Sequence, residues 1–171
     1  MVRVARFEKD SLRRFVTDWV ATFPQQTVEQ AVAAYERIRL PERATSGSAG
    51  YDLFAPVGFE LGAGEGIKIP TGLRVLIEEG WVMTIYPRSG LGFKYRFQLD
   101  NSVGVIDSDY AHSDNEGHIF MRMTNDSREG KTLIVPSGTA FAQGIFLPFG
   151  ITVDDHAQGV RNGGLGSTTG H

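Results

Sequence analysis

The sequence contains no cysteine, which excludes disulfide bonds and zinc sites with thiolate ligands. It has no excess of basic residues either, because 17 Lys and Arg stand against 20 Asp and Glu, for a net charge of -3. No apolar run is long enough to span a bilayer, and the N-terminus lacks the apolar core of a signal peptide. We therefore expect a cytoplasmic protein that binds neither a membrane nor the backbone of a nucleic acid.

Glycine, in contrast, is abundant. Its 21 residues make up about 12% of the 171-residue chain, against about 7% in typical proteins, which predicts many tight turns. The length suits a single domain with its own core. We divide this predicted domain, residues 1–171, into a strand and helical extension over 1–40, a β core over 41–158 and a flexible glycine-rich tail over 159–171.

The N-terminal extension carries the spacing of two helices. Apolar residues that recur every three or four positions predict a helix over residues 10–22. Thr27 followed by Gln30 has the pattern of a capping box and predicts a second helix over residues 27–38. Residues 2–7 alternate weakly and indicate an edge strand. We expect the helical pair to pack against the rest of the domain or against a neighbouring subunit.

From residue 41 onward, short apolar segments alternate with turns. Their even spacing and the glycines between them favour a β-sandwich or barrel over repeated βαβ units. The predicted fold is mainly β, a jelly-roll-like sandwich or barrel of short strands preceded by the helical pair. The predicted strands span residues 51–55, 66–69, 73–77, 81–86, 103–106, 118–124, 132–135 and 140–147.

The candidate site centres on Asp107. This residue ends a short apolar strand, and a carboxylate held there can take a proton from water. A polar turn formed by Asp107, Ser108 and Asp109 is the plainer alternative, since Asp and Ser are common in turns. Other segments favour a catalytic role, because together they supply the guanidinium, hydroxyl, amide and exposed backbone N–H groups that bind polyphosphate. These segments are residues 87–91 (PRSGL), 142–144 (AQG) and 161–168 (RNGGLGST).

Five segments in order resemble the five motifs of the trimeric dUTPases. They are residues 49–53 (AGYDL), 87–91 (PRSGL), 104–110 (GVIDSDY), 141–143 (FAQ) and the glycine-rich tail from Arg161. The match extends from about residue 40 to the C-terminus. The resemblance implies a β jelly-roll homotrimer with shared active sites, which hydrolyses dUTP to dUMP and pyrophosphate with the help of Mg2+.

The resemblance also implies roles for residues in and near the third motif. Asp107 matches the general base that activates water for attack on the α-phosphorus. Tyr110 matches the aromatic residue that packs beneath the deoxyribose and leaves no room for a 2′-hydroxyl. Asn101, with Val105 and Ile106 of the hairpin that leads to Asp107, matches the element that reads uracil.

The other motifs match elements that contact phosphate and metal. Phosphate contacts in the second and fourth motifs fall on Arg88, Ser89, Gly90 and Gln143. The tail residues that close over the substrate fall on Arg161, Leu165, Gly166, Ser167 and Thr168. Asp52 matches an acid near the water shell of magnesium, and no direct protein ligand of the ion is expected.

Some features depart from the family pattern or have no assigned role. Leu165 stands where most members carry a Phe or Tyr that stacks on uracil. Residues 111–116 form an insertion after Tyr110, and its role is open. His112 and His118 invite a metal interpretation, which we do not favour because the sequence offers no further imidazole or thiolate nearby.

Two other functions fit the same pocket. An enzyme resembling the dCTP deaminases shares the trimer and the pyrimidine site, and release of pyrophosphate without ammonia separates a dUTPase from it. A nucleotide-sensing trimer without turnover is the other alternative. The intact Asp107 argues against this second alternative, whereas Leu165 and the helical segment over residues 10–38 leave it open.

Overall fold

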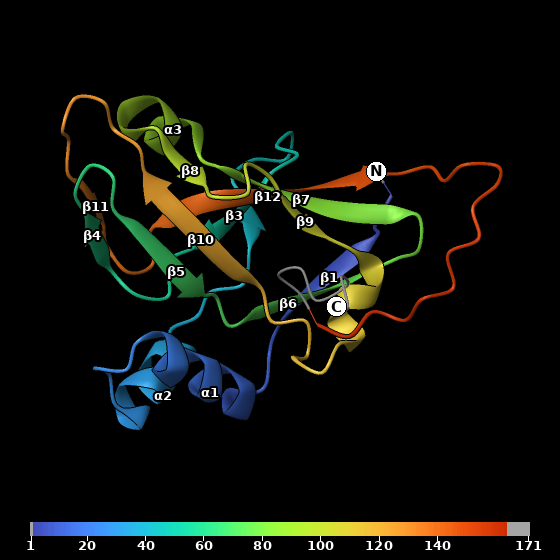
Figure 1. The fold of residues 1–171 in the computed structure, drawn as a ribbon, viewed down its shortest axis with the longest axis horizontal. Coiled ribbons are helices and arrows are strands. Elements are labelled where there is room, and N and C mark those ends of the chain that lie inside the picture. The colour runs from blue at the N-terminus through green and yellow to red at the C-terminus, as the bar shows by residue number, and fades with distance from the viewer. Residues whose placement is uncertain (1, 164–171) are drawn as a thin grey trace.

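The computed structural model describes residues 2–163 (Figure 1). Two helices lie on one side of the strands, and a long C-terminal arm, residues 149–163, leaves the end of the last strand. In chain order the elements are β1 (Ala5–Lys9), α1 (Leu12–Thr22), α2 (Val28–Glu36), β2 (Glu42–Arg43), β3 (Tyr51–Phe54), β4 (Phe59–Leu61), β5 (Gly66–Pro70), β6 (Leu73–Ile77), β7 (Trp81–Pro87), α3 (Ser89–Tyr95), β8 (Phe97–Leu99), β9 (Gly104–Ile106), the 3-10 helix η1 (Ser108–His112), β10 (Phe120–Asn125), β11 (Leu133–Val135) and β12 (Ala140–Pro148).

The strands form antiparallel sheets. The largest has the order β2-β3-β12-β7-β9, a second has the order β5-β10-β8, and β1-β6 and β11-β4 form pairs. The predicted mainly β fold is confirmed. Of the two predicted forms, the closed barrel is not found, because the sheets of residues 2–163 are open.

One hydrophobic core unites these sheets. Met83 and Ile85 of β7 are buried together with Met121 and Met123 of β10. Between the two methionines of β10, Arg122 points outward, as the alternation of a two-faced strand requires. The sheet faces that meet in this core therefore fix the relative positions of β7, β9 and β10.

The predicted helical pair is confirmed and packs on the core of its own chain. Phe15 and Trp19 of α1 are buried, with their ring centroids 5.0 Å apart. The N-terminus of α2 has the predicted capping box, in which the Thr27 hydroxyl accepts from the Gln30 N–H and the Gln30 side chain accepts from the Thr27 N–H. No helix within residues 2–163 combines the length and apolar composition needed to cross a membrane.

Several short elements were not predicted, namely β2, β4, β8, α3 and η1. Strands of two or three residues are too short to show alternation, and two glycines within α3 disfavour a helix. This helix ends at Arg96, whose φ of 51° is left-handed. Predicted ends also shift, since β1 spans Ala5–Lys9 instead of 2–7, and β10 begins at Phe120 because His118 belongs to a buried polar cluster.

This buried cluster joins the helical extension to the β core. The His118 Nδ1 atom lies 2.6 Å from Asp18 Oδ2 and 3.2 Å from Asp10 Oδ2. Within the described chain, neither carboxylate oxygen of Asp10 makes a hydrogen bond. Burial raises the pKa of Asp10 to about 6; nearby His118 opposes this shift, and the charges of Glu116 and Asp18 add to it.

We expect the substitution Asp10→Asn to stabilise the protein above about pH 6. The carboxyl group of Asp10 has a pKa of 3.8 in the unfolded chain and about 6 in the folded protein. Its protonated form therefore stabilises the fold fully below pH 3.8, and this contribution is lost as the pH rises through about 6. The Asn amide stays neutral at every pH, so it does not lose this stabilisation when the pH rises. The free energy of unfolding near neutral pH should therefore increase by up to about 3 kcal/mol. Urea unfolding at about pH 4 and about pH 7.5 measures the effect.

The exposed Asp154 provides a control, because Asp154→Asn should leave the unfolding free energy nearly unchanged at both pH values. Equal stability of wild type and Asp10→Asn at the higher pH would contradict the assignment of a buried, poorly solvated carboxylate.

Candidate active site

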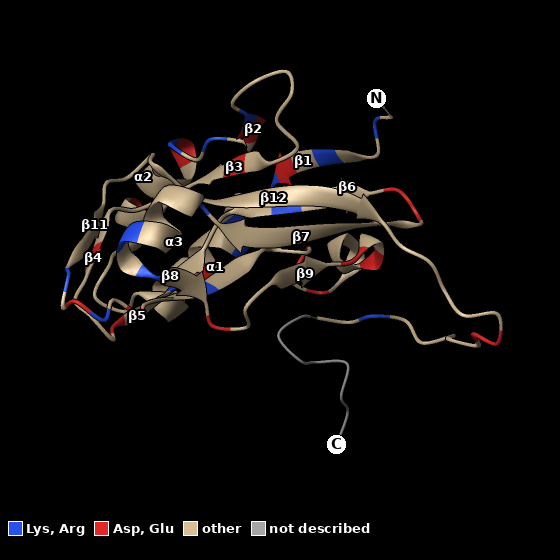
Figure 2. Cartoon of the chain, turned by 90° about the horizontal axis from the view of Figure 1, so that it is seen from above, with Lys and Arg blue, Asp and Glu red and all other residues tan. Residues whose placement is uncertain are grey.

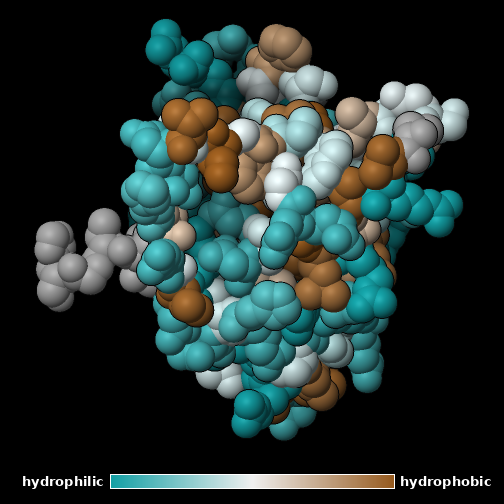
Figure 3. Space-filling view, turned by 90° about the vertical axis from the view of Figure 1, so that its right-hand side faces the viewer, coloured by the Kyte–Doolittle hydropathy of each residue, from teal (hydrophilic) through white to brown (hydrophobic). Residues whose placement is uncertain are grey.

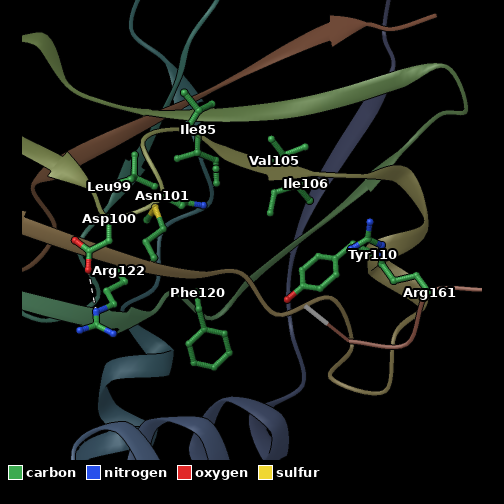
Figure 4. A pocket seen from close by; sticks show the side chains of 13 residues that line it. Ile85, Leu99, Asp100, Asn101, Val105, Ile106, Tyr110, Phe120, Arg122 and Arg161 are labelled. Atoms are coloured by element: carbon green, nitrogen blue, oxygen red, sulfur yellow. Dashed lines mark ion pairs between the residues drawn. The ribbon is translucent and has the colours of Figure 1, made fainter. Parts of the chain in front are cut away.

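A cavity of about 510 Å³ opens between β9, β10 and η1. Its sides come from segments far apart in the sequence, including the hairpin before β9 and the C-terminal arm (Figure 4). The residues that line it are Ile85, Leu99, Asp100, Asn101, Val103, Gly104, Val105, Ile106, Tyr110, Phe120, Met121, Arg122 and Arg161. The structure thus brings together five residues predicted from the sequence, Asn101, Val105, Ile106, Tyr110 and Arg161.

Close packing against β7 fixes the hairpin that carries Asn101. β9 pairs with β7 so that Ile106 lies opposite Met83 and Gly104 lies opposite Ile85. A Cβ atom at Gly104 would lie 3.1 Å from the Cβ atom of Ile85, so glycine permits this close approach. The pairing positions β9 as an edge strand whose next residue is Asp107.

Asp107 follows β9 at the N-cap position of η1; it is not itself a lining residue, but it adjoins Ile106, which lines the cavity. Its carboxylate forms an ion pair with Arg161 Nη2, while Arg161 Nε donates to Asp109 Oδ1 at 2.9 Å. The sequence predicts that Arg161 closes over the substrate phosphates in a site shared between chains. In the described chain, the arm returns toward η1 and places Arg161 on its own Asp107 (Figures 1 and 2).

Tyr110 forms one wall of the cavity. The residue is 7% exposed, and its hydroxyl donates to the His118 carbonyl oxygen at 2.7 Å. Figure 4 shows its ring on the same side of the cavity as Arg161, below Ile106. Burial raises the pKa of Tyr110, and Asn115, which donates to the hydroxyl at 2.8 Å, opposes that shift. The ring is therefore held at one end by the backbone of Tyr110 in η1 and at the other end by the two hydrogen bonds of its hydroxyl.

The predicted phosphate contacts lie elsewhere in the chain. Gln143 lies opposite Asp52 in the β12–β3 pairing, and Arg88 Nε lies 3.4 Å from Asp52 Oδ1. Ser89 and Gly90 begin α3, next to Arg88. Met83 of β7 lies opposite Ile106, the residue before Asp107. Arg88 comes five residues after Met83, which is about 17 Å along a strand. One chain therefore does not bring these groups to the Asp107 cavity.

Among the cavity residues that were not predicted as site residues, two are charged. Asp100 and Arg122 face each other across the left side of the cavity in Figure 4, with Arg122 Nε 2.9 Å from Asp100 Oδ2. One sequence feature could have indicated Arg122. It is a charged residue between Met121 and Met123, so it lies on the outer face of its strand. The predicted tail residues Leu165, Gly166, Ser167 and Thr168 lie outside the described residues.

Comparison with known proteins identifies the family. Residues 36–169 match the dUTPase family. The deoxyuridine 5′-triphosphate nucleotidohydrolase of Lactococcus lactis is 42% identical over 134 residues, which cover 77% of this chain and 88% of the relative. The dUTPase structure from Streptococcus mutans has a TM-score of 0.59 and 39% identity, covering 68% of this chain and 89% of that chain. The chain belongs to the dUTPase family.

More distant structures share the fold over a larger part of the chain. A dUTPase from phage phi11 of S. aureus, described with a structural Mg(II) ion, has a TM-score of 0.62 and 19% identity and covers 92% of this chain and 98% of that chain. The dUTPase of Staphylococcus bacteriophage 80alpha with dUPNHPP has a TM-score of 0.64 and 18% identity, covering 92% and 90%. At these identities the likeness concerns the fold alone.

We expect Gly104→Ala to weaken nucleotide binding. The added Cβ would press on the Cβ of Ile85, which is fixed in β7, so the hairpin would have to move away from the sheet. This displacement should raise the Kd of a non-hydrolysable dUTP analogue by about tenfold or more. Gly47→Ala is the control, because a Cβ there meets nothing within 4 Å. Calorimetric titration measures both variants, and wild-type affinity of a folded Gly104→Ala protein would contradict the expectation.

Proposed function

We propose that the protein hydrolyses dUTP to dUMP and pyrophosphate in the cavity between β9 and β10. The observation that carries this proposal is the position of Asp107, at the end of β9 and directly beside a cavity lined by Asn101, Ile106 and Tyr110. A relative that is 42% identical, from Lactococcus lactis, is a deoxyuridine 5′-triphosphate nucleotidohydrolase, which supports the same substrate here.

In the proposed reaction Asp107 acts as the general base. Its side chain is 41% exposed, so water can reach the carboxylate. The carboxylate takes a proton from water as the water oxygen attacks the α-phosphorus. The bond between this phosphorus and the α–β bridging oxygen breaks, and the electron pair leaves with pyrophosphate. Asp107 then holds the proton removed from water.

Arg161 links this step to substrate binding. Its guanidinium contacts the carboxylates of both Asp107 and Asp109 in the described chain. A triphosphate offers more negative charge to the same guanidinium than one carboxylate does. We infer that a bound substrate draws an Arg161 side chain onto its phosphates, and that this releases Asp107 to contact water.

The remaining roles follow from the positions of the cavity residues. Tyr110 supports the deoxyribose and excludes a 2′-hydroxyl, while Asn101 and the hairpin backbone bind uracil. A site that leaves buried polar groups unpaired with the wrong base can discriminate by about 10⁴. The phosphate contacts in this proposal are Arg88, Ser89, Gly90, Gln143, Arg161, Ser167 and Thr168, with Leu165 and Gly166 covering the base.

Magnesium assists the proposed reaction without a cage of protein ligands. In residues 2–163 no group of three or more His, Asp or Glu side chains has an arrangement that could hold a metal ion. Asp52 lies beside the proposed phosphate contact Arg88, which supports a contact between its carboxylate and water molecules of the ion. When bound to the substrate, Mg2+ would neutralise negative charge on the phosphate oxygens.

We expect Asp107→Asn to abolish most turnover while binding is preserved. The amide has the size of the carboxylate but cannot take the proton of water, so kcat should fall by at least about a hundredfold. Asp109→Asn is the matched control, since it removes the neighbouring carboxylate that also pairs with Arg161, and it should lose much less. Pyrophosphate release measures turnover, and a non-hydrolysable analogue measures binding. Hydrolysis by Asp107→Asn within a few-fold of wild type would place the base elsewhere.

We further propose that three chains assemble and share their active sites. The separation of Arg88 and Gln143 from Asp107 within one chain supports this, because a second chain can supply the phosphate contacts. Figure 3 views the end of the molecule from which the arm projects and shows separate hydrophobic patches among hydrophilic residues. Burial of exposed apolar side chains at about 25 cal/mol per Å² would stabilise the assembly. Those near this end include Leu147, Phe149, Ile151, Val153 and Val160.

Mixed trimers test the sharing directly. If the arm of one chain completes the Asp107 site of another, refolding Asp107→Asn together with Arg161→Ala should restore part of the activity, because some sites receive an intact residue of each kind. If each Arg161 serves only its own Asp107, as in the described chain, every mixed site keeps one defect. Pyrophosphate release from the refolded mixture measures the outcome, and mixtures as inactive as either parent would rule out the shared arrangement.

A further inference from the structure

The insertion over residues 111–116 connects the N-terminal helix to the cavity. At one end of the insertion, the Glu116 carboxylate accepts from the Ser11 N–H at 2.8 Å and from the Ser11 hydroxyl at 2.7 Å. Ser11 is the N-cap of α1. Glu116 has a φ of 60°, which is uncommon for a residue with a side chain, so the loop holds a restricted backbone to make this contact.

Within the same loop, Asn115 holds the hydroxyl of Tyr110. Its Nδ2 donates to the tyrosine oxygen at 2.8 Å, and its Oδ1 accepts from the Gly117 N–H at 3.1 Å. Gly117 has a φ of 73°, and a Cβ there would lie 2.5 Å from the Ala111 Cα, so the loop is closely packed. Asn115 is thereby held between the Tyr110 hydroxyl and the Gly117 backbone.

The second partner of the tyrosine hydroxyl is the backbone of His118. Both nitrogens of this imidazole are engaged, since Nε2 accepts from the Gly72 N–H at 2.9 Å and Nδ1 lies 2.6 Å from Asp18 Oδ2. Nε2 therefore carries no proton, and Nδ1 donates to the carboxylate of α1. The His118 ring also packs against Phe120, another cavity residue, at 4.5 Å.

We propose that Asn115, His118 and Asp18 are positioning residues that set the position of the Tyr110 ring, and that the N-terminal helix thereby controls the discrimination between deoxyribose and ribose. This inference rests on the proposed function of the cavity. Exclusion of a 2′-hydroxyl is steric, so it requires a ring that does not yield by even a fraction of an ångström. A tyrosine held by two hydrogen bonds to a loop and a buried cluster meets that requirement.

The test compares the binding of α,β-imido analogues of dUTP and UTP by calorimetry. Asn115→Ala removes the donor to Tyr110, and Ser11→Ala removes one hydroxyl contact between α1 and the loop, distant from the nucleotide. We expect Asn115→Ala to lower the ratio of the UTP-analogue Kd to the dUTP-analogue Kd by about tenfold or more, and Ser11→Ala to lower it by less. The Kd for the dUTP analogue should change only a few-fold.

Gln26→Ala is the matched control. Gln26 accepts from the buried Trp19 Nε1–H at 2.7 Å, so its loss destabilises the C-terminal end of the same helix while every hydrogen bond of Asn115, His118 and Tyr110 is kept. The control should lower the Tm and leave the Kd ratio unchanged. An unchanged ratio in Ser11→Ala and Asn115→Ala, or an equal fall in Gln26→Ala, would overturn the inference. If Asn115→Ala does not fold, the Ser11→Ala result decides alone.

Wild-type turnover is measured separately. If the wild type binds the dUTP analogue but does not hydrolyse dUTP, the proposed function fails while the Kd ratio still tests the positioning. If it binds neither analogue, the positioning inference fails as well.

Discussion

The antiparallel pairing of β7 with β12 on one side and β9 on the other determines where the functional groups lie. β9 is paired antiparallel with the middle of β7, and Ile106 lies opposite Met83, so Asp107 follows toward the N-terminal end of β7. Arg88 follows the opposite end. Hydrogen bonds along the sheet fix this separation, and a side-chain rotation cannot close a gap of five strand residues. The fold thus holds the Asp107 cavity apart from the proposed phosphate contacts around Arg88. The proposed site therefore requires groups from more than one chain.

The proposed base, Asp107, follows a short edge strand and needs support from outside the sheet. β9 has three residues, and an edge strand is bonded on one side only. The described structure supplies the missing support through the segment that follows. Tyr110 is tied to the backbone of His118, and His118 is tied to Asp18 of α1. The helical extension adds no residue to the cavity lining, but Asp18 of α1 is thereby connected through His118 to Tyr110.

The sequence predicted the periodic parts of the fold well. Leu73–Ile77 is a strand with the predicted ends, and the Thr27 capping box starts α2, because alternation and capping are local properties of the chain. The resemblance to the ordered motifs likewise led us to expect Asn101 and Tyr110 close together, and both line the same cavity. These predictions required no knowledge of how distant segments pack.

The polar cluster could not be predicted in the same way. His118 and Asp18 are separated by 100 positions, and neither lies in a pattern that indicates the other. Their contact depends on how α1 packs against the β core, which is a tertiary property. The same holds for Asp100 and Arg122, whose pairing follows from the arrangement of the hairpin beside β10. The ion pair of Arg161 with Asp107 depends on the path of the arm, and residues 149–160 carry no helical or strand periodicity that would predict this path.

The most direct measurement of the central claim is the release of pyrophosphate from a panel of nucleotides by the purified protein, with and without a magnesium chelator. We expect pyrophosphate from dUTP, much less from UTP, dCTP and dTTP, no ammonia from dCTP, and loss of activity with the chelator. Ammonia from dCTP, or no pyrophosphate from dUTP in the presence of magnesium, would contradict the claim.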